Sequence, residues 1–154
     1  AHRHPDYLVL GSDTVIEIDG TLVGKPQDLD DAETMLCQLR GRTHQVHTGI
    51  ALIHETVSVT VVRGETALVR MTAFTDQELR HYLETEESLG KAGAYSIQGE
   101  GARFIEKIEG DYPTIVGLPL RQTADLLEQR GVMLKTPVEE IYRLKPYANW
   151  KVFG

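Results

Sequence analysis

The segment Gly11-Ser12-Asp13-Thr14 carries the first side chains that could do chemistry. It follows the apolar run 7–10, and this pattern predicts a buried strand that ends at a sharp turn. Ligands of α/β proteins bind at such strand ends. The Asp13 carboxylate could hold a metal ion through oxygen and orient a water for attack on phosphorus. The alternative is a turn carboxylate that bonds only its own backbone.

Two later segments could complete a phosphate site. In Gly24-Lys25-Pro26 the flanking residues restrain the loop, so that Lys25 could point into a cleft as a phosphate cation; a solvated loop lysine is the alternative. The segment 91–101 is rich in glycine, which lets a backbone approach a ligand closely and lets N–H groups hold an anion. Within it, Gln98 offers a donor and an acceptor, as reading a base edge requires. The alternative there is a loose connecting loop.

The composition excludes several classes of protein. A net charge of −7 argues against binding to a nucleic acid polymer, which takes clustered Lys and Arg. No apolar run approaches the roughly 20 residues that a membrane span requires, and the polar start 1–6 has no signal-peptide core. The single cysteine, Cys37, fits a reducing compartment, and its apolar neighbours predict a buried thiol. We therefore expect a cytoplasmic protein that does not bind membranes.

A small set of strands and helices must position these side chains. Asp19-Gly20 suits the positive φ angles of a two-residue hairpin turn. Asp30 is placed to cap a helix, and Thr75 and Glu78 form a capping box. The expected elements are a hairpin over 15–23, a helix over 30–39, two or three antiparallel strands over 44–70, a helix over 75–86, a strand over 102–108 and a helix over 119–131. This order predicts a mixed α/β fold, in which a twisted sheet is flanked by helices and carries a cleft.

The character of the sequence changes near residue 133. We expect one domain over residues 1–132, followed by a tail over 133–154. Trp150 and Phe153 would be costly to leave in water, so the tail is predicted to pack on the domain. A partner-binding or poorly ordered end is the alternative.

Two other chemistries are less well supported. The segment 18–22 resembles the phosphate-transfer motif of the haloacid dehalogenase superfamily, but that chemistry needs a nucleophilic Asp where this chain has Glu17. The six histidines are scattered, and no pair has the helical spacing of a zinc site. His44 and His47 are three residues apart in a predicted strand, so we expect them on opposite faces.

Several motifs that recur in order resemble the Maf family of nucleotide pyrophosphatases. The resemblance covers about residues 5–131. The matching segments are 8–15 (Leu-Val-Leu-Gly-Ser-Asp-Thr-Val), 24–26 (Gly-Lys-Pro), 35–49, 91–99, 110–112 and 116–120. The resemblance implies a fold of the Maf/inosine-triphosphatase type.

The resemblance also implies an activity: divalent-metal-dependent cleavage, with Mg²⁺ or Mn²⁺, between the α- and β-phosphates of a nucleoside triphosphate. The Asp-Thr pair and the Ile-Gln-Gly segment resemble the branch that acts on dTTP and UTP, or on modified pyrimidine triphosphates. By this resemblance Asp13 activates water and contacts the metal. Lys25 and Lys91 bind phosphate, and Thr14 and Gln98 discriminate among substrates.

One departure from the family pattern affects the expected activity. Family members begin with a strand that leads into a Ser-x-Ser-Pro-Arg-Arg loop, which the present sequence lacks. We expect either a fragment of a longer protein or a shortened member, in which each lost arginine contact would cost roughly 10²–10³ in rate. The sheet edge left open is expected to pair chains as a homodimer. A smaller departure is Gly90, where an Asp is usual.

Two functions of other classes stay open at this point. A non-catalytic remnant would bind a nucleotide or a protein partner without turning it over. A purely structural role would use the Trp150 tail to bind a partner. Release of pyrophosphate separates the enzyme from the remnant, and removal of the tail tests the structural role.

Overall fold

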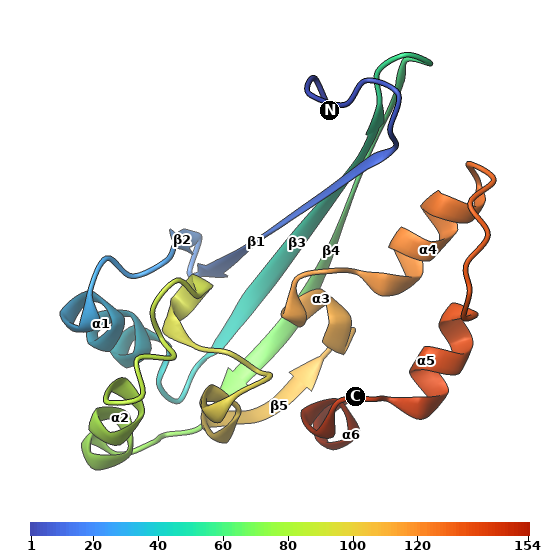
Figure 1. The fold of residues 1–154 in the computed structure, drawn as a ribbon. Coiled ribbons are helices and arrows are strands. Elements are labelled where there is room, and N and C mark those ends of the chain that lie inside the picture. The colour runs from blue at the N-terminus through green and yellow to red at the C-terminus, as the bar shows by residue number, and fades with distance from the viewer.

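A computed structural model describes all 154 residues, which form a five-stranded antiparallel sheet in the order β2-β1-β3-β4-β5 (Figure 1). The strands are β1 (Val9–Ile18), β2 (Thr21–Val23), β3 (Thr43–His54), β4 (Val59–Met71) and β5 (Ile105–Glu109). The helices are α1 (Leu29–Leu39), α2 (Asp76–Leu83), α3 (Tyr112–Val116), α4 (Leu120–Glu128), α5 (Val138–Leu144) and α6 (Ala148–Phe153), with two 3₁₀ segments, η1 (Ala92–Ala94) and η2 (Glu100–Phe104). The predicted fold class, a sheet flanked by helices, is confirmed.

The hairpin predicted at Asp19-Gly20 is confirmed. Asp19 and Gly20 have φ angles of 52° and 77°, the positive values that a two-residue turn between β1 and β2 requires. The predicted strands between 44 and 70 are two, β3 and β4, paired along their whole length. Gly49 and Gly64 do not interrupt them, because they lie directly opposite each other in the middle of the ladder.

The first strand differs from its prediction. The expected turn at Gly11-Ser12 does not exist, because β1 continues through it and pairs with β3 from Val9 to Glu17. A local Gly-Ser signal is here overridden by nine consecutive cross-strand pairs. Asp13 therefore lies in the middle of a strand and not beyond its end.

Helix boundaries follow the predicted capping residues with one exception. Thr75 forms the predicted capping box with Glu78 at the start of α2, and α4 begins after Pro119 as expected. The cap of α1 is Asp28 instead of Asp30, since the Asp28 carboxylate accepts the Asp31 N–H at 2.9 Å. Asp28 and Asp30 are both residues that cap helices well, so the sequence alone did not decide between them.

The core lies between one face of the sheet and the helices. Alternate residues of β3 are buried, as a strand covered on one face requires. They are His44, Val46, Thr48, Ile50 and Leu52. Residues from α1, α2, α3 and α6 join the strands in a single cluster of 22 buried residues. Cys37 is exposed, so the prediction of a buried thiol is wrong; the apolar face of α1 is formed by Ala32, Leu36 and Leu39.

The C-terminal residues pack on the domain, as the cost of exposing Trp150 predicts. Trp150 is 3% exposed and belongs to the main core cluster, and Phe153 packs against that cluster. In Figure 1, α5 and α6 lie on the side of α3 and β5, away from α1 and α2. None of the helices combines the length and the apolar character needed to cross a membrane.

Candidate functional site

One cleft collects the side chains that the sequence predicted to form the site. It has a volume of about 250 Å³ and runs between β1, the loop after β2, the segment around η1 and the end of α3. Its lining includes the five predicted site residues Asp13, Thr14, Lys25, Lys91 and Gln98. These residues come from three segments of the chain, the last of which (91–98) is far from the other two in sequence, so the fold brings them together.

Asp13 borders the cleft from an exposed position on β1, but it alternates with Ser12 and Thr14, so its side chain lies on the opposite face of the sheet from theirs. It also lines a shallow hollow on that face with Gly49 and Val62. Its carboxylate accepts the backbone N–H of Thr14 at 3.0 Å, so the local backbone bond that sequence reasoning weighed is present. No ion pair engages this carboxylate. Asp13 is also the only acidic residue of the cleft lining. A solvent-accessible, unpaired carboxylate is available to take a proton or to bind a cation.

Thr14 is held by a chain of hydroxyl groups on the covered face of the sheet. The Thr48 hydroxyl lies 2.7 Å from the carbonyl oxygen of Thr114 and 2.7 Å from the Thr14 hydroxyl. A carbonyl can only accept, so Thr48 donates its proton to Thr114 and must accept the proton of Thr14. The Thr14 oxygen is then left as an acceptor at the cleft.

Ser12 joins the two sides of the cleft, which sequence reasoning did not anticipate. Its hydroxyl lies 2.7 Å from the carbonyl oxygen of Gly117 and 3.0 Å from that of Gly49. It therefore ties β1 to the end of α3, where Ile115, Val116 and Gly117 form a wall of the cleft. The missed signal was a hydroxyl residue alternating with Thr14 along one face of β1.

The two lysines are brought to the same cleft by a backbone contact. The Gly93 N–H donates to the Gly24 carbonyl at 2.9 Å, which places the segment of Lys91 beside that of Lys25. Gly93 has a φ of 66°, and a Cβ there would lie 2.5 Å from the Ile16 Cδ1 atom, so a larger residue would be strained at this position. Neither lysine takes part in an ion pair, which leaves both ammonium groups free to meet an anion.

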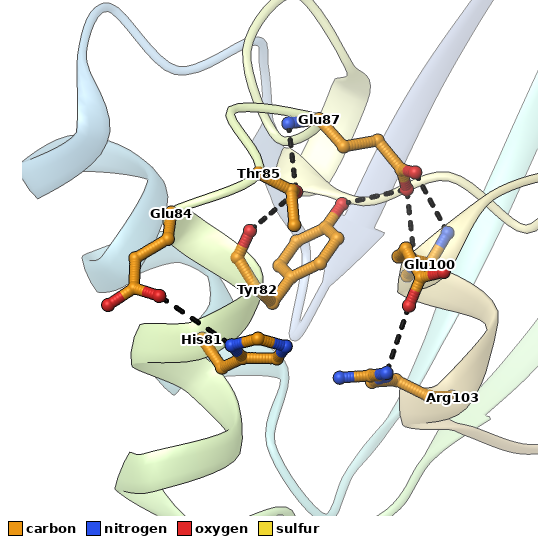
Figure 2. A network of polar contacts seen from close by, with 8 residues as sticks. His81, Tyr82, Glu84, Thr85, Glu87, Glu100 and Arg103 are labelled. Atoms are coloured by element: carbon orange, nitrogen blue, oxygen red, sulfur yellow. Dashed lines mark hydrogen bonds and ion pairs between the residues drawn. The ribbon is translucent and has the colours of Figure 1, made fainter.

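Gln98 is exposed at the cleft on a loop that a carboxylate holds in place. Figure 2 shows the side chain of Glu87 reaching across to the start of η2. Its oxygens accept the N–H groups of Glu100 at 2.8 Å and Gly101 at 3.0 Å, and the Tyr82 hydroxyl at 3.2 Å. The segment is therefore an ordered turn directly after Gln98, and not the loose loop of the alternative.

A buried pair lies beneath the cleft. The His44 Nε2 atom is 2.8 Å from the Tyr95 hydroxyl, and Tyr95 also lines the cleft. Burial lowers the pKa of His44 to about 4 and raises the pKa of Tyr95, so both stay neutral near pH 7. His47 lies on the opposite face and contacts Glu17, as the spacing of the two histidines predicts.

The residues fit a divalent cation only in part. No group of three or more His, Cys, Asp or Glu side chains is placed to hold a metal ion. Mg²⁺ is commonly held by one or two carboxylates together with substrate phosphates. Asp13, the single carboxylate of the cleft, matches the protein half of such a site.

The sequence is similar to a group of known proteins. Residues 1–130 match the family described as Maf-like protein. The chain is 49% identical over 130 residues to a protein of Aromatoleum aromaticum named dTTP/UTP pyrophosphatase, across 84% of this chain and 62% of that one. Identity to proteins of the same name is 44% over 134 residues in Symbiobacterium thermophilum (87% and 68% covered) and 44% over 129 residues in Clostridioides difficile (84% and 66% covered). The matches thus span about two thirds of the length of these relatives.

Proposed function

The chain belongs to the Maf family, and we propose that it acts as a nucleoside triphosphate pyrophosphatase, which hydrolyses dTTP and UTP to the monophosphate and pyrophosphate. One observation carries the proposal: the only acidic residue of the cleft, Asp13, two lysines without ion pairs and the amide of Gln98 line the same cavity. The names of the relatives, dTTP/UTP pyrophosphatase, support the choice of substrate. Modified pyrimidine triphosphates belong to the same class.

Asp13 is proposed as the general base. Its carboxylate takes a proton from water while the water oxygen bonds to phosphorus, and the α–β phosphoanhydride bond breaks to release pyrophosphate. The carboxylate is exposed and takes part in no ion pair, so it is free to accept that proton. A Mg²⁺ or Mn²⁺ ion, held by Asp13 and the substrate phosphates, would neutralise phosphate charge when bound.

The two lysines are proposed to bind the triphosphate. Each is free of ion pairs and can meet a phosphate oxygen through a charge-assisted bond. Lys25 approaches from the loop after β2 and Lys91 from the segment before η1, so the two charges reach the cleft from separate elements. The overall charge of −7 would repel a polyphosphate, and the two lysines make the cleft locally attractive to it.

Thr14 and Gln98 are proposed to select the base. Uracil and thymine present an N3–H donor between two carbonyl acceptors, whereas cytosine presents an acceptor at N3. The Thr14 oxygen, left as an acceptor by its bond to Thr48, can accept the N3–H. The Gln98 amide can donate to a neighbouring carbonyl. Together they favour uracil and thymine over cytosine.

A homodimer in the cytoplasm is proposed for the assembled protein. The β1 residues before Ile16 pair with β3 only, so their other edge is open. An open strand edge favours pairing with a second chain. Light scattering across a concentration series measures the mass in solution, and a monomer at all concentrations would rule the dimer out.

The test of the activity is pyrophosphate release. Asp13→Asn should lower kcat for dTTP by at least roughly 10², the usual contribution of a general base, with the melting temperature nearly unchanged. Asp125→Asn is the control, because Asp125 is an exposed carboxylate on α4 outside the cleft. The relative from Aromatoleum aromaticum serves as the positive control for the assay.

Three results of this experiment separate the functions. Activity of Asp13→Asn within a few-fold of the parent would rule out Asp13 as the base. Tight binding of dUTP by the parent, without release of pyrophosphate, would make this chain a nucleotide-binding module. If the parent neither binds a nucleotide nor releases pyrophosphate, the proposed function is overturned.

A further inference from the structure

We propose that Asn149, on the C-terminal helix α6, is a positioning residue that sets the selectivity of the cleft through Gln98. The inference rests on the proposed function, in which Gln98 reads the base. It concerns residues 131–154, which lie beyond the segment that matches the family. Base selection in this protein then depends on a part of the chain outside the family match.

The contact that carries the inference is a hydrogen bond to the backbone. The Asn149 side-chain N–H donates to the carbonyl oxygen of Ile97 at 2.8 Å. This carbonyl and the N–H of Gln98 belong to the same planar peptide unit. Fixing the carbonyl therefore fixes the plane from which the Gln98 side chain departs. The N–H of the same peptide unit, that of Gln98, donates to the Ser96 hydroxyl at 3.3 Å.

Packing alone does not fix Gln98. Its side chain is exposed, and Gln98 and Val116 border both the cleft and a second, largely apolar cavity of about 410 Å³. Tyr147 and Trp150 of the C-terminal segment form the far side of that cavity. With open space on two sides, the Gln98 side chain depends on its own backbone for direction.

Asn149 is itself held firmly, because its neighbour is an anchor. Trp150 is 3% exposed and stacks on Tyr112 at 5.6 Å between ring centroids, with an angle of 9° between the planes. Tyr142 packs edge-on against Trp150 at 5.1 Å, and its hydroxyl donates to the Asp111 carboxylate at 2.5 Å. Two adjacent residues of α6 thus contact two walls of the cleft. Trp150 packs against α3, and Asn149 bonds the segment of Gln98.

The test is a double-mutant cycle read as selectivity. Specificity constants for dTTP and CTP are measured for the parent, Asn149→Ala, Gln98→Ala and the double variant. Asn149→Ala should lower the dTTP-to-CTP ratio by about threefold to tenfold, the net worth of one hydrogen bond. In the Gln98→Ala background, the same change should leave the ratio unaltered. Lys151→Ala, an exposed change on the same helix, is the matched control and should match the parent.

A merely structural role for Asn149 would give a different pattern. It would lower the rates for dTTP and CTP alike, or lower the ratio equally with and without Gln98, and either result overturns the proposal. If the parent turns over no triphosphate, the proposed function fails by itself. The ratio is then taken from the Kd values of the α,β-imido analogues of dUTP and dCTP.

A second measurement needs no nucleotide. Hydrogen exchange of the Gln98 amide should be faster in Asn149→Ala than in the parent, with no change in Lys151→Ala. Unchanged exchange at Gln98 in Asn149→Ala would show that the bond to Ile97 does not hold this segment, and would overturn the inference whatever the activity.

Discussion

The hydroxyl of Thr14 donates to the hydroxyl of Thr48, and the bond is 2.7 Å long. Its direction is set at the other end of the chain, where Thr48 must donate to the Thr114 carbonyl. Thr48 is 1% exposed and does not line the cleft, yet it determines whether Thr14 offers an oxygen or a proton to a ligand. Thr48 thus sets the hydrogen-bonding character of the Thr14 hydroxyl without lining the cleft itself.

Thr48→Val tests this relationship. The variant keeps the shape of the side chain but frees the Thr14 proton, which could then be donated to N3 of cytosine. The dTTP-to-CTP ratio of specificity constants should fall roughly tenfold, since one base contact is worth about 1–3 kcal/mol. Loss of the bond from Thr48 should lower the free energy of unfolding by about 0.5–1.5 kcal/mol, because the Thr114 carbonyl still accepts the Gly117 N–H at 3.2 Å. Thr48→Ser, which keeps the hydroxyl, should retain the ratio, and a ratio unchanged in Thr48→Val would refute the polarity argument.

Gln98→Ala should change the choice among triphosphates more than the rate on the best of them. An amide that pairs with a base edge contributes discrimination of roughly 1–3 kcal/mol. The measurement is the set of specificity constants for dTTP, UTP, CTP and GTP. Gln38→Ala, on the exposed side of α1, is the control. A uniform fall in rate with constant ratios would instead make Gln98 a residue that positions the substrate.

His44 should make folding sensitive to mild acid. Burial lowers its pKa to about 4 in the folded chain, against an unfolded value of 6.5, so the folded state favours the neutral ring. Its contribution to stability is therefore complete above pH 6.5 and declines as the pH falls towards 4, by about 3 kcal/mol in all. Urea unfolding of the parent and of His44→Gln between pH 7 and 4.5 measures the difference. His81→Gln, an exposed histidine of α2, is the control and should retain the pH dependence of the parent.

Gly99→Ala should destabilise the protein through Glu87. A Cβ at Gly99 would lie 2.1 Å from the Glu87 carboxylate, which is held by the N–H groups that follow. Moving this carboxylate should cost about 1–3 kcal/mol, the usual penalty of overpacking. In Glu87→Ala the same substitution meets no carboxylate and should cost much less. Gly11→Ala, where the added Cβ meets no atom within 4 Å, is the control. Equal costs in both backgrounds would place the strain elsewhere.

Local signals in the sequence predicted the turns and most helix starts. The Asp19-Gly20 hairpin and the Thr75 capping box depend on residues within three positions of one another, and both are confirmed. The Gly11-Ser12 signal failed because the pairing of β1 with β3 joins residues that are distant in sequence. A propensity read from neighbours cannot include that pairing energy.

The residues that line the cleft were predicted from the sequence, but the residues that hold them in place were not. The motif resemblance named five residues, and the fold places all five on one cleft. The residues that hold them in place were missed, because their partners are far away in the sequence. Thr48 bonds a carbonyl 66 residues away, and Asn149 bonds one 52 residues away. No periodicity or spacing in one sequence carries such pairs.

The facing glycines of the two longest strands bear on how a ligand can arrive. Asp13, Gly49 and Gly64 occupy one row across three strands, and directly opposed residues of antiparallel strands share a face. Asp13 therefore has no side chain directly opposite it on β3, and a Cβ at Gly49 would meet only the Arg63 carbonyl, at 3.9 Å. A larger residue would fit at Gly49, so the glycine is not needed for packing. Its effect is to leave the space beside the Asp13 carboxylate open. On this face, opposite to the Thr14 hydroxyl, the sheet leaves the carboxylate open to a ligand. A bulky side chain at Gly49 would block that approach without unfolding the protein.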